Sequence, residues 1–322
     1  MKKLHWGVMG TADIAKTATI PSLRAADNAR LYAIAGRSME KAQSFRERFG
    51  FERAYGSYDE LLADANVEAV YIPLPNDLHC PWAIKAMEAG KHVLCEKPLA
   101  ISEEQEIKMF DCARKNGVLL MEGFAYLHSP IVQAIKQEVE SGVIGDIRYL
   151  ESAFLGGIRP DTDIRLRRET FGGSMYDLGC YPLSMALWML DGEITKVHAA
   201  AEFTEKKIDL YSTALLTFES GAVASLTCGM ALEEGRRDGL SIFGTKGEII
   251  SPVAFNQPGK IEYTVIAGGR AQTKAVMAPG NYQLEMEQFG RCVLDGEKPH
   301  ISREFSLRTA REMDRILARM GY

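Results

Sequence analysis

The sequence predicts an α/β protein: a doubly wound parallel Rossmann sheet, followed by an α+β domain with a large, mainly antiparallel open sheet. Apolar runs alternate with helical stretches through residues 1–122, which is typical of parallel strands joined by helices. Residues 123–322 contain successive strand-like runs joined by short, often glycine-bearing links, which is typical of antiparallel strands. A length of 322 residues suits two domains. We therefore expect domains at 1–122 and 123–322.

The first strand leads into a glycine-containing turn. The apolar run Leu4–Met9 is followed by a G-x-A-x-x-A pattern, and then by a helical stretch towards Pro21. Gly10 allows a tight turn, Ala12 lets backbone approach a pyrophosphate, and Ala15 allows close packing of helix on strand. An ordinary strand-to-helix turn is the alternative. The expected dinucleotide contacts in this turn are Gly10, Thr11, Ala12 and Ile14.

The second strand ends where a dinucleotide enzyme selects between NAD and NADP. Leu31–Ala35 is followed by Gly36, Arg37 and Ser38, with no Asp or Glu for a ribose hydroxyl. Arg offers a charged planar fork for a 2′-phosphate, and Ser adds a hydroxyl donor. We therefore expect NADP, with NAD less favoured. The alternative is that Arg37 is a solvated loop residue.

Two further strand ends carry polar residues. The strand Ala69–Ile72 leads into a segment from which we expect Pro73, Asn76 and His79 to contact the cofactor. The strand His92–Cys95 is followed directly by Glu96-Lys97-Pro98. Ligands of open α/β sheets bind beyond the carboxyl ends of strands, and a lysine beside a carboxylate can polarise a substrate hydroxyl there. The alternative is a loop with a surface ion pair of little energetic worth.

Other elements follow from caps and periodicity. In the first half we expect helices at Glu40–Phe49, Tyr58–Ala63 behind a Ser57 cap, Pro81–Ala89 and from a Ser102 capping box to Lys115, and a strand at Val118–Met121. In the second half we expect a helix at Ile131–Glu140, a strand at Ile147–Phe154, a helix through Trp188, strands at Val197–Thr204, Leu210–Phe218, Ala222–Cys228, Gly239–Phe243, Glu248–Ile250, Ile261–Ile266 and Gln272–Val276, and helices at Tyr282–Leu294 and Phe305–Met320 behind a Ser302 cap.

A second polar constellation lies on the helix that follows Gly172-Gly173. Asp177 and Tyr181 are four residues apart, which places them on one face, one turn apart. A carboxylate, a phenol and a lysine can bind a hydroxyl and move its proton. The alternative is that Tyr181 packs in the core with its hydroxyl bonded.

Composition narrows the function classes. The net charge is −5 and there is no basic run, so neither nucleic acid nor an acidic membrane surface is an expected partner. The start lacks the apolar core of a signal peptide, and no apolar stretch is long enough to span a bilayer. The six cysteines contain no C-x-x-C pair and indicate reduced thiols in the cytoplasm. No cluster has metal-ligand spacing, so we expect no metal.

Taken together, these motifs resemble the Gfo/Idh/MocA family of oxidoreductases over nearly the whole chain. The most specific marks are Glu96-Lys97-Pro98 and the pattern from Gly172-Gly173 through Asp177 to Gly179-Cys180-Tyr181. The resemblance implies a Rossmann domain followed by a mainly antiparallel sheet. It implies that Lys97 binds the reacting oxygen, that Glu96 helps to hold the nicotinamide ribose, and that the peptide bond before Pro98 is cis.

Many members of the family have a catalytic His where this sequence has Tyr181. The Gly-Cys-Tyr signature resembles the branch of dimeric dihydrodiol dehydrogenases, NADP-dependent D-xylose dehydrogenases and glucose–fructose oxidoreductase, in which Tyr is the acid/base. The resemblance implies substrate contacts from Arg165, Phe124, Asp177 and Tyr181, with Lys97, Tyr181 and Asp177 catalytic.

The expected function is NADP-dependent hydride transfer between the nicotinamide and a sugar or trans-diol hydroxyl or carbonyl. Two alternatives stay open: an NADPH-dependent reductase of an anhydro-sugar or dicarbonyl, and a non-catalytic NADP-binding redox sensor. The expected partners are a small polyol or sugar and further copies of the chain, forming a homodimer or homotetramer through the C-terminal sheet.

Overall fold

The computed structural model describes residues 2–233, 237–252 and 255–322, which form two compact units. The first unit comprises Met1–Ala125 and Tyr282–Leu307, and the second comprises Tyr126–Asn281 and Arg308–Tyr322. The expected division near residue 122 was continuous, whereas the observed units are not, because a late helix returns to the first sheet. The ring of Phe289 packs on Trp6 with a centroid distance of 4.9 Å, and Asn28 donates its amide to the Glu287 carbonyl at 2.8 Å.

The first unit is built on a sheet in which every neighbouring pair of strands is parallel. Its strands are β1 (Leu4–Met9), β2 (Ala29–Ala35), β3 (Arg53–Tyr55), β4 (Ala69–Ile72), β5 (His92–Glu96) and β6 (Leu120–Gly123). Their order, β3-β2-β1-β4-β5-β6, is that of a dinucleotide-binding Rossmann sheet. Sequence analysis missed only the three-residue β3, which is too short to show periodicity.

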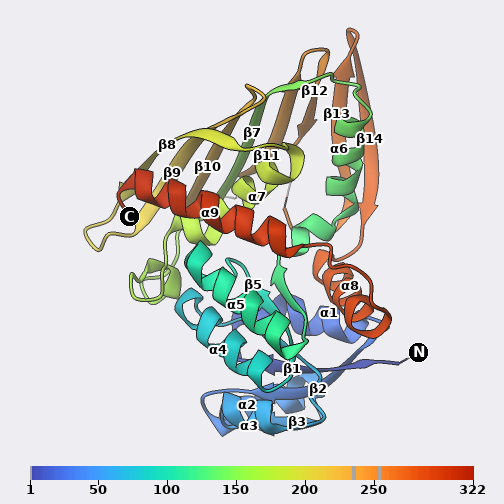
Figure 1. The fold of residues 1–322 in the computed structure, drawn as a ribbon, viewed down its shortest axis with the longest axis vertical. Coiled ribbons are helices and arrows are strands. Elements are labelled where there is room, and N and C mark those ends of the chain that lie inside the picture. The colour runs from blue at the N-terminus through green and yellow to red at the C-terminus, as the bar shows by residue number, and fades with distance from the viewer. Residues whose placement is uncertain (1, 234–236, 253–254) are drawn as a thin grey trace. The chain divides into compact units, whose positions relative to one another are not determined.

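Helices connect these strands along the chain, and one helix from late in the sequence belongs to the same unit. They are η1 (Ala15–Thr19), α1 (Ile20–Ala25), α2 (Met39–Phe49), α3 (Tyr58–Ala63), α4 (Asn76–Glu88), α5 (Glu103–Asn116) and α8 (Asn281–Asp295). Figure 1 shows α8 beside α1, where Gln283 donates to the Ala25 carbonyl at 3.5 Å.

Two helix boundaries differ from the expectation, both at prolines. The first helix passes through Pro21, which lies at the start of α1 behind a π-helical turn. The helix expected to begin at Pro81 begins at Asn76, with Pro81 inside it. Proline removes one backbone donor, and near a helix start few intrahelical bonds are lost. The Ser57 and Ser102 caps are confirmed, with backbone N–H donors at 3.2 and 3.4 Å from their hydroxyls.

The second unit is built on an eight-stranded sheet. Its strands are β7 (Ile147–Gly157), β8 (Ile194–Phe203), β9 (Asp209–Phe218), β10 (Val223–Leu232), β11 (Arg237–Gly244), β12 (Gly247–Ser251), β13 (Gly259–Ala267) and β14 (Arg270–Ala278). The order is β14-β13-β12-β11-β7-β10-β9-β8, and only the β7–β10 pair is parallel. The expected fold class is therefore confirmed.

Helices of the second unit cover one face of its sheet. They are η2 (Ala125–His128), α6 (Pro130–Glu140), η3 (Ile164–Leu166), η4 (Met175–Gly179), α7 (Cys180–Met189) and the later part of α9 (Arg303–Met320). In Figure 1, α6 runs along β13 and β14, and Glu138 bonds both Tyr263 and Lys274 there. Along β9, buried Ala214 and Leu216 alternate with exposed Thr213 and Leu215, so the other face is open within this chain.

Candidate functional site

The first strand–helix turn requires a glycine at its start. Gly10 has φ +122°, where a side chain would be strained, and a Cβ there would meet Leu74 Cδ2 at 3.1 Å. Thr11, Ala12 and Ile14 follow it half-buried, and the first helical bond runs from the Lys16 N–H to the Ala12 carbonyl at 3.1 Å. Unpaired N–H groups at such a helix start fit a pyrophosphate. The predicted turn residues are thus together.

Arg37 and Ser38 follow β2 but differ in their surroundings. The Ser38 hydroxyl accepts the Lys41 N–H at 3.5 Å and caps α2. Arg37 is exposed and, among the described residues, no carboxylate lies within ion-pair distance of it. Burial raises the pKa of Tyr58, and the charge of Arg37 acts against that rise. Because the Tyr58 hydroxyl lies 3.6 Å from where a Gly10 Cβ would be, Arg37 is near the nucleotide turn.

The segment after β4 is tied to the segment after β5 by His79. Its Nδ1 lies 2.8 Å from the Pro98 carbonyl oxygen and its Nε2 lies 2.8 Å from that of Leu74. The side chain is 1% exposed, and this burial lowers its pKa. Pro73 is buried, and Asn76 begins α4 half-buried. The His79 side chain therefore joins the two loops, and both of its ring nitrogens are occupied by backbone carbonyls.

Glu96, at the end of β5, terminates a buried hydrogen-bond chain. The Thr19 hydroxyl donates to the Tyr71 hydroxyl at 2.9 Å, and Tyr71 donates to Glu96 Oε1 at 2.5 Å. Burial, followed by the nearby Glu96 charge, raises the pKa of Tyr71 well above its ordinary value. Lys97 follows half-buried, and the Lys97–Pro98 peptide bond is cis, as expected.

The turn that carries Lys97 is also held by Glu122, which sequence analysis missed. The Leu99 N–H donates to Glu122 Oε1 at 3.0 Å, and Glu122 pairs with Cys95 across β6 and β5. Burial raises the pKa of Glu122 to about 7, although the Ser306 hydroxyl, the Leu99 N–H and the charge of Lys97 act to lower it. The expected strand Val118–Met121 ends two residues before β6 does, and a carboxylate directly after an apolar run was the available signal.

Phe124, an expected substrate contact, is 1% exposed, and its ring lies 6.3 Å from that of Phe305. Its side chain is therefore packed inside the first unit. Phe124 would therefore affect a ligand only indirectly, through the residues that pack against its ring.

In the second unit, Asp177 is bound by two arginines. Its Oδ2 accepts from Arg159 Nη2 at 2.9 Å and lies 2.8 Å from Arg165 Nε. Asp163 also contacts Arg165, at 3.3 Å. The charge of Asp177 raises the pKa of Arg165 further above its ordinary value. Sequence analysis missed Arg159; four arginines in the loop 158–168 did not show which of them would face inward.

The helix carrying Asp177 starts on a buried carboxylate. Asp209 Oδ2 accepts from the Ser174 hydroxyl and from the Met175 N–H, each at 2.7 Å. Gly173 has φ +120°, and a Cβ there would lie 2.0 Å from Asp209 Oδ1. The absence of a side chain at Gly173 therefore lets the backbone approach the Asp209 carboxylate closely. The first turn is π-helical rather than α-helical, over Met175–Gly179.

Tyr181 is 7% exposed and is packed in an aromatic cluster. The rings of Phe154, Phe255 and Tyr126 lie 5.0, 5.3 and 5.4 Å from its ring. Asn256 Nδ2 donates to its hydroxyl oxygen at 3.2 Å. Sequence analysis did not single out Asn256, because nothing in the local pattern relates it to a tyrosine 75 residues earlier.

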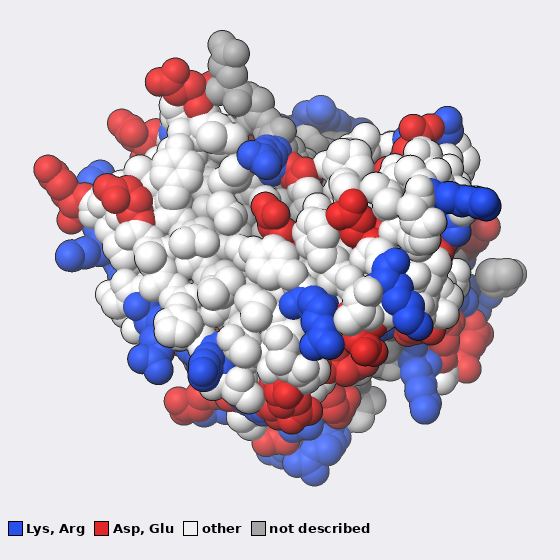
Figure 2. Space-filling model, turned by 90° about the horizontal axis from the view of Figure 1, so that it is seen from above, with Lys and Arg blue, Asp and Glu red and all other residues white. Residues whose placement is uncertain are grey.

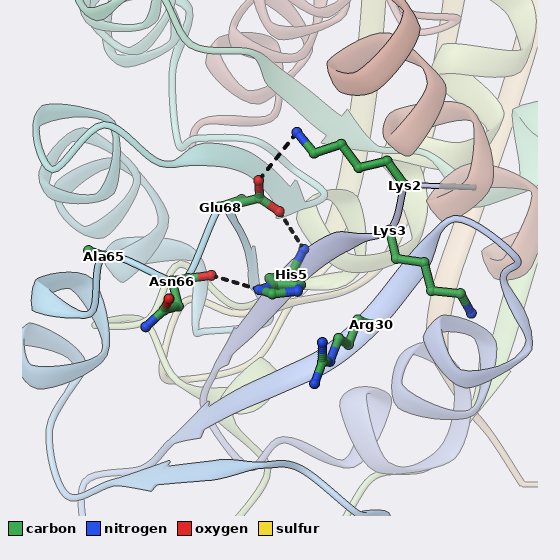
Figure 3. Close-up of a pocket in the computed structure, with 7 residues that line it drawn as sticks. All are labelled: Lys2, Lys3, His5, Arg30, Ala65, Asn66 and Glu68. Atoms are coloured by element: carbon green, nitrogen blue, oxygen red, sulfur yellow. Dashed lines mark hydrogen bonds and ion pairs between the residues drawn. The ribbon is translucent and has the colours of Figure 1, made fainter.

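A shallow pocket lies at the other end of the parallel strands, near the start of β1. Figure 3 shows its lining: Lys2, Lys3, His5, Arg30, Ala65, Asn66 and Glu68. Lys2 lies 3.7 Å from Glu68, and Arg30 lies 2.5 Å from Glu52. Lys3 extends away from His5 in Figure 3. The cations do not converge, so this pocket is no part of the candidate site.

Within the first unit, the predicted cofactor residues gather at the carboxyl edge of the sheet. Within the second, Asp177, Arg165 and Tyr181 belong to a loop and the helix that follows it. Across the described residues, no helix has the length and apolarity needed to cross a membrane. No cluster of three or more potential metal-ligand side chains was found in residues 2–233, 237–252 and 255–322. These features define an oxidoreductase with a dinucleotide-binding Rossmann domain.

Comparison with known proteins identifies the family. Residues 4–124 match the oxidoreductase family with an NAD-binding Rossmann fold, and residues 132–250 match the GFO/IDH/MocA C-terminal domain. The chain therefore belongs to the Gfo/Idh/MocA family and is an NAD(P)-dependent dehydrogenase or reductase.

Relatives cover almost the whole chain. D-xylose 1-dehydrogenase (NADP(+)) 2 of Haloferax volcanii is 35% identical over 97% of this chain and 96% of the relative. Trans-1,2-dihydrobenzene-1,2-diol dehydrogenase of Xenopus laevis is 29% identical over 98% of each. The 3-ketoreductase KijD10 of Actinomadura kijaniata, solved with NADP and TDP-benzene, has a TM-score of 0.93 and 34% identity, covering 99% of this chain and 98% of that one.

Proposed function

We propose that this protein is an NADP-dependent oxidoreductase that transfers a hydride between the nicotinamide and a sugar or trans-diol hydroxyl or carbonyl. The observation that carries the proposal is the pair of polar groups that the two units present, one in each. A half-buried lysine follows the nucleotide-binding strands in one unit, and a buried tyrosine stands one turn after a carboxylate in the other. The NADP-dependent xylose dehydrogenase and the dihydrodiol dehydrogenase among the relatives support this substrate class.

The residues take the following roles in this proposal. Lys97 binds the reacting oxygen through its ammonium group, and Tyr181 accepts the hydroxyl proton. A free phenol has a pKa of about 10, so Tyr181 needs groups that favour its phenolate. Asp177, fixed by its two arginines, orients the substrate through a neighbouring hydroxyl. NADP, when bound, supplies the hydride acceptor.

The cofactor would be held along the carboxyl edge of the first sheet. Gly10 to Ala12 would approach the pyrophosphate, Glu96 would hold the nicotinamide ribose, and exposed Arg37 would bind the 2′-phosphate. KijD10 contains NADP and supports the choice of NADP over NAD. Tyr58 and Leu74 border the turn without filling it.

Replacing Tyr181 tests the proposed chemistry. Tyr181→Phe should lower turnover by a factor of about 10²–10⁴, because the proton acceptor is lost, while NADPH binding is kept. Turnover is read at the nicotinamide absorbance with the best substrate of a panel, and binding by NADPH fluorescence. Tyr176→Phe, in the π-helical turn that precedes α7, is the matched control and should retain activity. Turnover near that of the parent in Tyr181→Phe would remove Tyr181 from the mechanism.

Replacing Arg37 tests the cofactor preference. Arg37→Ala should weaken NADPH by about 10–100-fold and change NADH binding little, since only NADPH carries the 2′-phosphate that a charge-assisted bond would hold. Arg48→Ala, an exposed arginine on α2, is the control. Equal losses for the two cofactors in a binding titration would contradict this assignment.

The two alternatives call for a wider panel. Aldoses, polyols and trans-diols with NADP test the forward reaction, and anhydro-sugar ketones, dicarbonyls and a nucleotide-linked keto-sugar with NADPH test the reverse. A redox sensor would bind NADPH tightly and turn over none of them. The combination of Lys97, Asp177 and Tyr181 supports an enzyme, because a sensor requires none of the three.

We further propose that the open sheet face of the second unit joins copies of the chain. Its outward side chains include Tyr211, Thr213, Leu215 and Val223, which are uncharged. Figure 2 shows a broad uncharged area on one side of the molecular face that it draws, with charged residues around it. Leu215→Lys should reduce the mass measured by sedimentation, and an unchanged dimer would contradict the proposal. None of the six cysteines forms a disulfide within the described residues, which supports a cytoplasmic location.

A further inference from the structure

Tyr181 needs a group within its own unit that favours its charged form. Three aromatic rings enclose its ring, and an apolar enclosure of this kind disfavours a phenolate. The side chain of Asn256 is placed on the hydroxyl itself. Asn256 Nδ2 lies 3.2 Å from Tyr181 Oη, with the N–H as donor. A hydrogen bond that is donated to the phenol oxygen strengthens when that oxygen becomes negative.

The backbone holds Asn256 in a conformation that few residues adopt. Its φ is +45°, in the left-handed region, which Asn and Asp tolerate better than other residues with side chains. Its Oδ1 is buried and accepts no hydrogen bond from the described residues. The bond to Tyr181 is the only hydrogen bond shown for this amide within the described residues. The hydrogen bond shown for the Asn256 side chain is therefore made to the Tyr181 hydroxyl and not to the backbone of its own loop.

Tyr126 and Asp177, which also lie in the second unit, have other partners. The Tyr126 hydroxyl lies 2.7 Å from the Ser184 hydroxyl and 3.3 Å from the Tyr181 backbone carbonyl. Asp177 is negatively charged and is occupied by its arginines, so it would disfavour a second negative charge. Asn256 is thus the neutral donor that faces the reacting atom.

We propose that Asn256 is a positioning residue for the reaction, which holds the Tyr181 hydroxyl and stabilises its phenolate by donating an N–H to Oη. The inference rests on the proposed role of Tyr181. It adds to that role a source of activation inside the second unit, independent of the lysine in the first.

Two variants test the donor while keeping the unusual backbone conformation. Asn256→Asp keeps the shape and replaces the donor with an acceptor that carries negative charge, and Asn256→Gly removes the amide. Asn116→Asp, exposed at the end of α5, controls for the added charge. Thermal unfolding of each variant shows that it is folded.

The first readout is the pH dependence of turnover in the oxidising direction. Loss of the donor should move the acid limb to higher pH by about one to two units, which is a fall of about 10–100-fold below the limb. Asn256→Asp should shift it further than Asn256→Gly, and Asn116→Asp should not shift it. A limb at the same pH in all four proteins would overturn the proposal, as would a uniform fall without a shift.

The second readout does not depend on turnover. The phenolate absorbance of the parent minus that of Tyr181→Phe, followed with pH, reports ionisation of Tyr181 alone. The same difference in the Asn256→Asp and Asn256→Gly backgrounds should show a higher midpoint. If Tyr181→Phe keeps its activity, the proposed function loses its base, whereas this titration still decides whether Asn256 favours the phenolate; an unchanged midpoint overturns it.

Discussion

The two units hold buried carboxyl groups in opposite ways. In the first unit, Glu122 and Glu285 are 2% and 0% exposed, and burial raises the pKa of both. In the second, Asp177 is 8% exposed but is bound by two guanidinium groups. Asp209, also in the second unit, is subject to both influences. Burial raises its pKa, and three hydrogen-bond donors act to lower it.

The difference teaches that burial alone does not set the charge of a site. Glu122 and Glu285 have no arginine on their carboxyl groups among the described residues and hold their protons to higher pH. The stability of the first unit should therefore respond to pH near neutrality. A carboxylate fixed by two arginines stays charged, so its geometry should be steady over the same range. We expect stability to depend on pH through the first unit, and the geometry around Asp177 to depend on its arginines.

The largest effect should come from removing both arginines of the second unit. Arg159→Met with Arg165→Met removes both guanidinium groups that bind the buried carboxylate of Asp177 among the described residues. Breaking such a pair costs about 3–5 kcal/mol when it is fully buried, and we expect about 3 kcal/mol because both arginines are partly exposed. Turnover should fall about 100-fold. Urea unfolding and steady-state kinetics measure the two effects.

A third substitution checks the cause. Adding Asp177→Asn to the double variant removes the unpaired charge and should restore most of the stability, but not the turnover. If the double variant is as stable as the parent, the arginines do not support Asp177 in the way that the geometry indicates.

A somewhat smaller effect, of opposite sign, should come from Glu285. Both of its carboxyl oxygens lack a hydrogen-bond partner among the described residues, and burial, with the Glu96 charge second, raises its pKa well above the ordinary value. Between the unfolded and folded pKa values only the folded state keeps the proton, so stability falls by up to about 1.4 kcal/mol per pH unit as pH rises. Glu285→Gln should therefore gain about 2–3 kcal/mol at pH of about 8.

The gain should shrink towards zero below the unfolded pKa of about 4.5, where both states are protonated. Urea unfolding at low and high pH measures it, with Glu40→Gln, an exposed position on α2, as the control. An equal gain at both pH values would show that packing, and not the proton, is responsible.

Sequence reasoning reached the fold because its signals are local. Residues only a few positions apart determine the alternation of strands and helices, the serine caps and the polar residues that end each strand. It also singled out Lys97, Asp177 and Tyr181 as a predicted site, because their spacing and the family resemblance mark them. The structure added Glu122, Arg159 and Asn256, whose partners are 23, 18 and 75 residues away in the chain. Only the folded chain pairs such residues, so no local pattern identifies them.

The return of α8 to the first sheet was beyond local signals for the same reason. Phe289 and Glu285 read as one apolar and one polar position of an amphipathic helix. Nothing near them indicates that Phe289 faces Trp6, or that Glu285 points into the interior near Glu96. A polar residue on the buried face of a helix is found only when the identity of that face is known.

The smallest of the three effects should come from Glu122, and it links the pH response to the lysine turn. Its pKa is about 7, so stability should fall as pH rises from about 4.5 to 7. The fall is at most about 1.4 kcal/mol for each of about 2.5 pH units.

Glu122→Gln keeps an oxygen for the Leu99 N–H at 3.0 Å and removes the titration. We expect about 2 kcal/mol of added stability above pH of about 7, which is less than this upper limit because a neutral amide oxygen accepts from the Leu99 N–H and the Ser306 hydroxyl less strongly than a carboxylate does. Urea unfolding across this range measures it, and an unchanged pH dependence would show that Glu122 is not the group that titrates. If turnover in Glu122→Gln keeps its dependence on pH while stability loses it, the turn is held by the Leu99 bond and not by the charge.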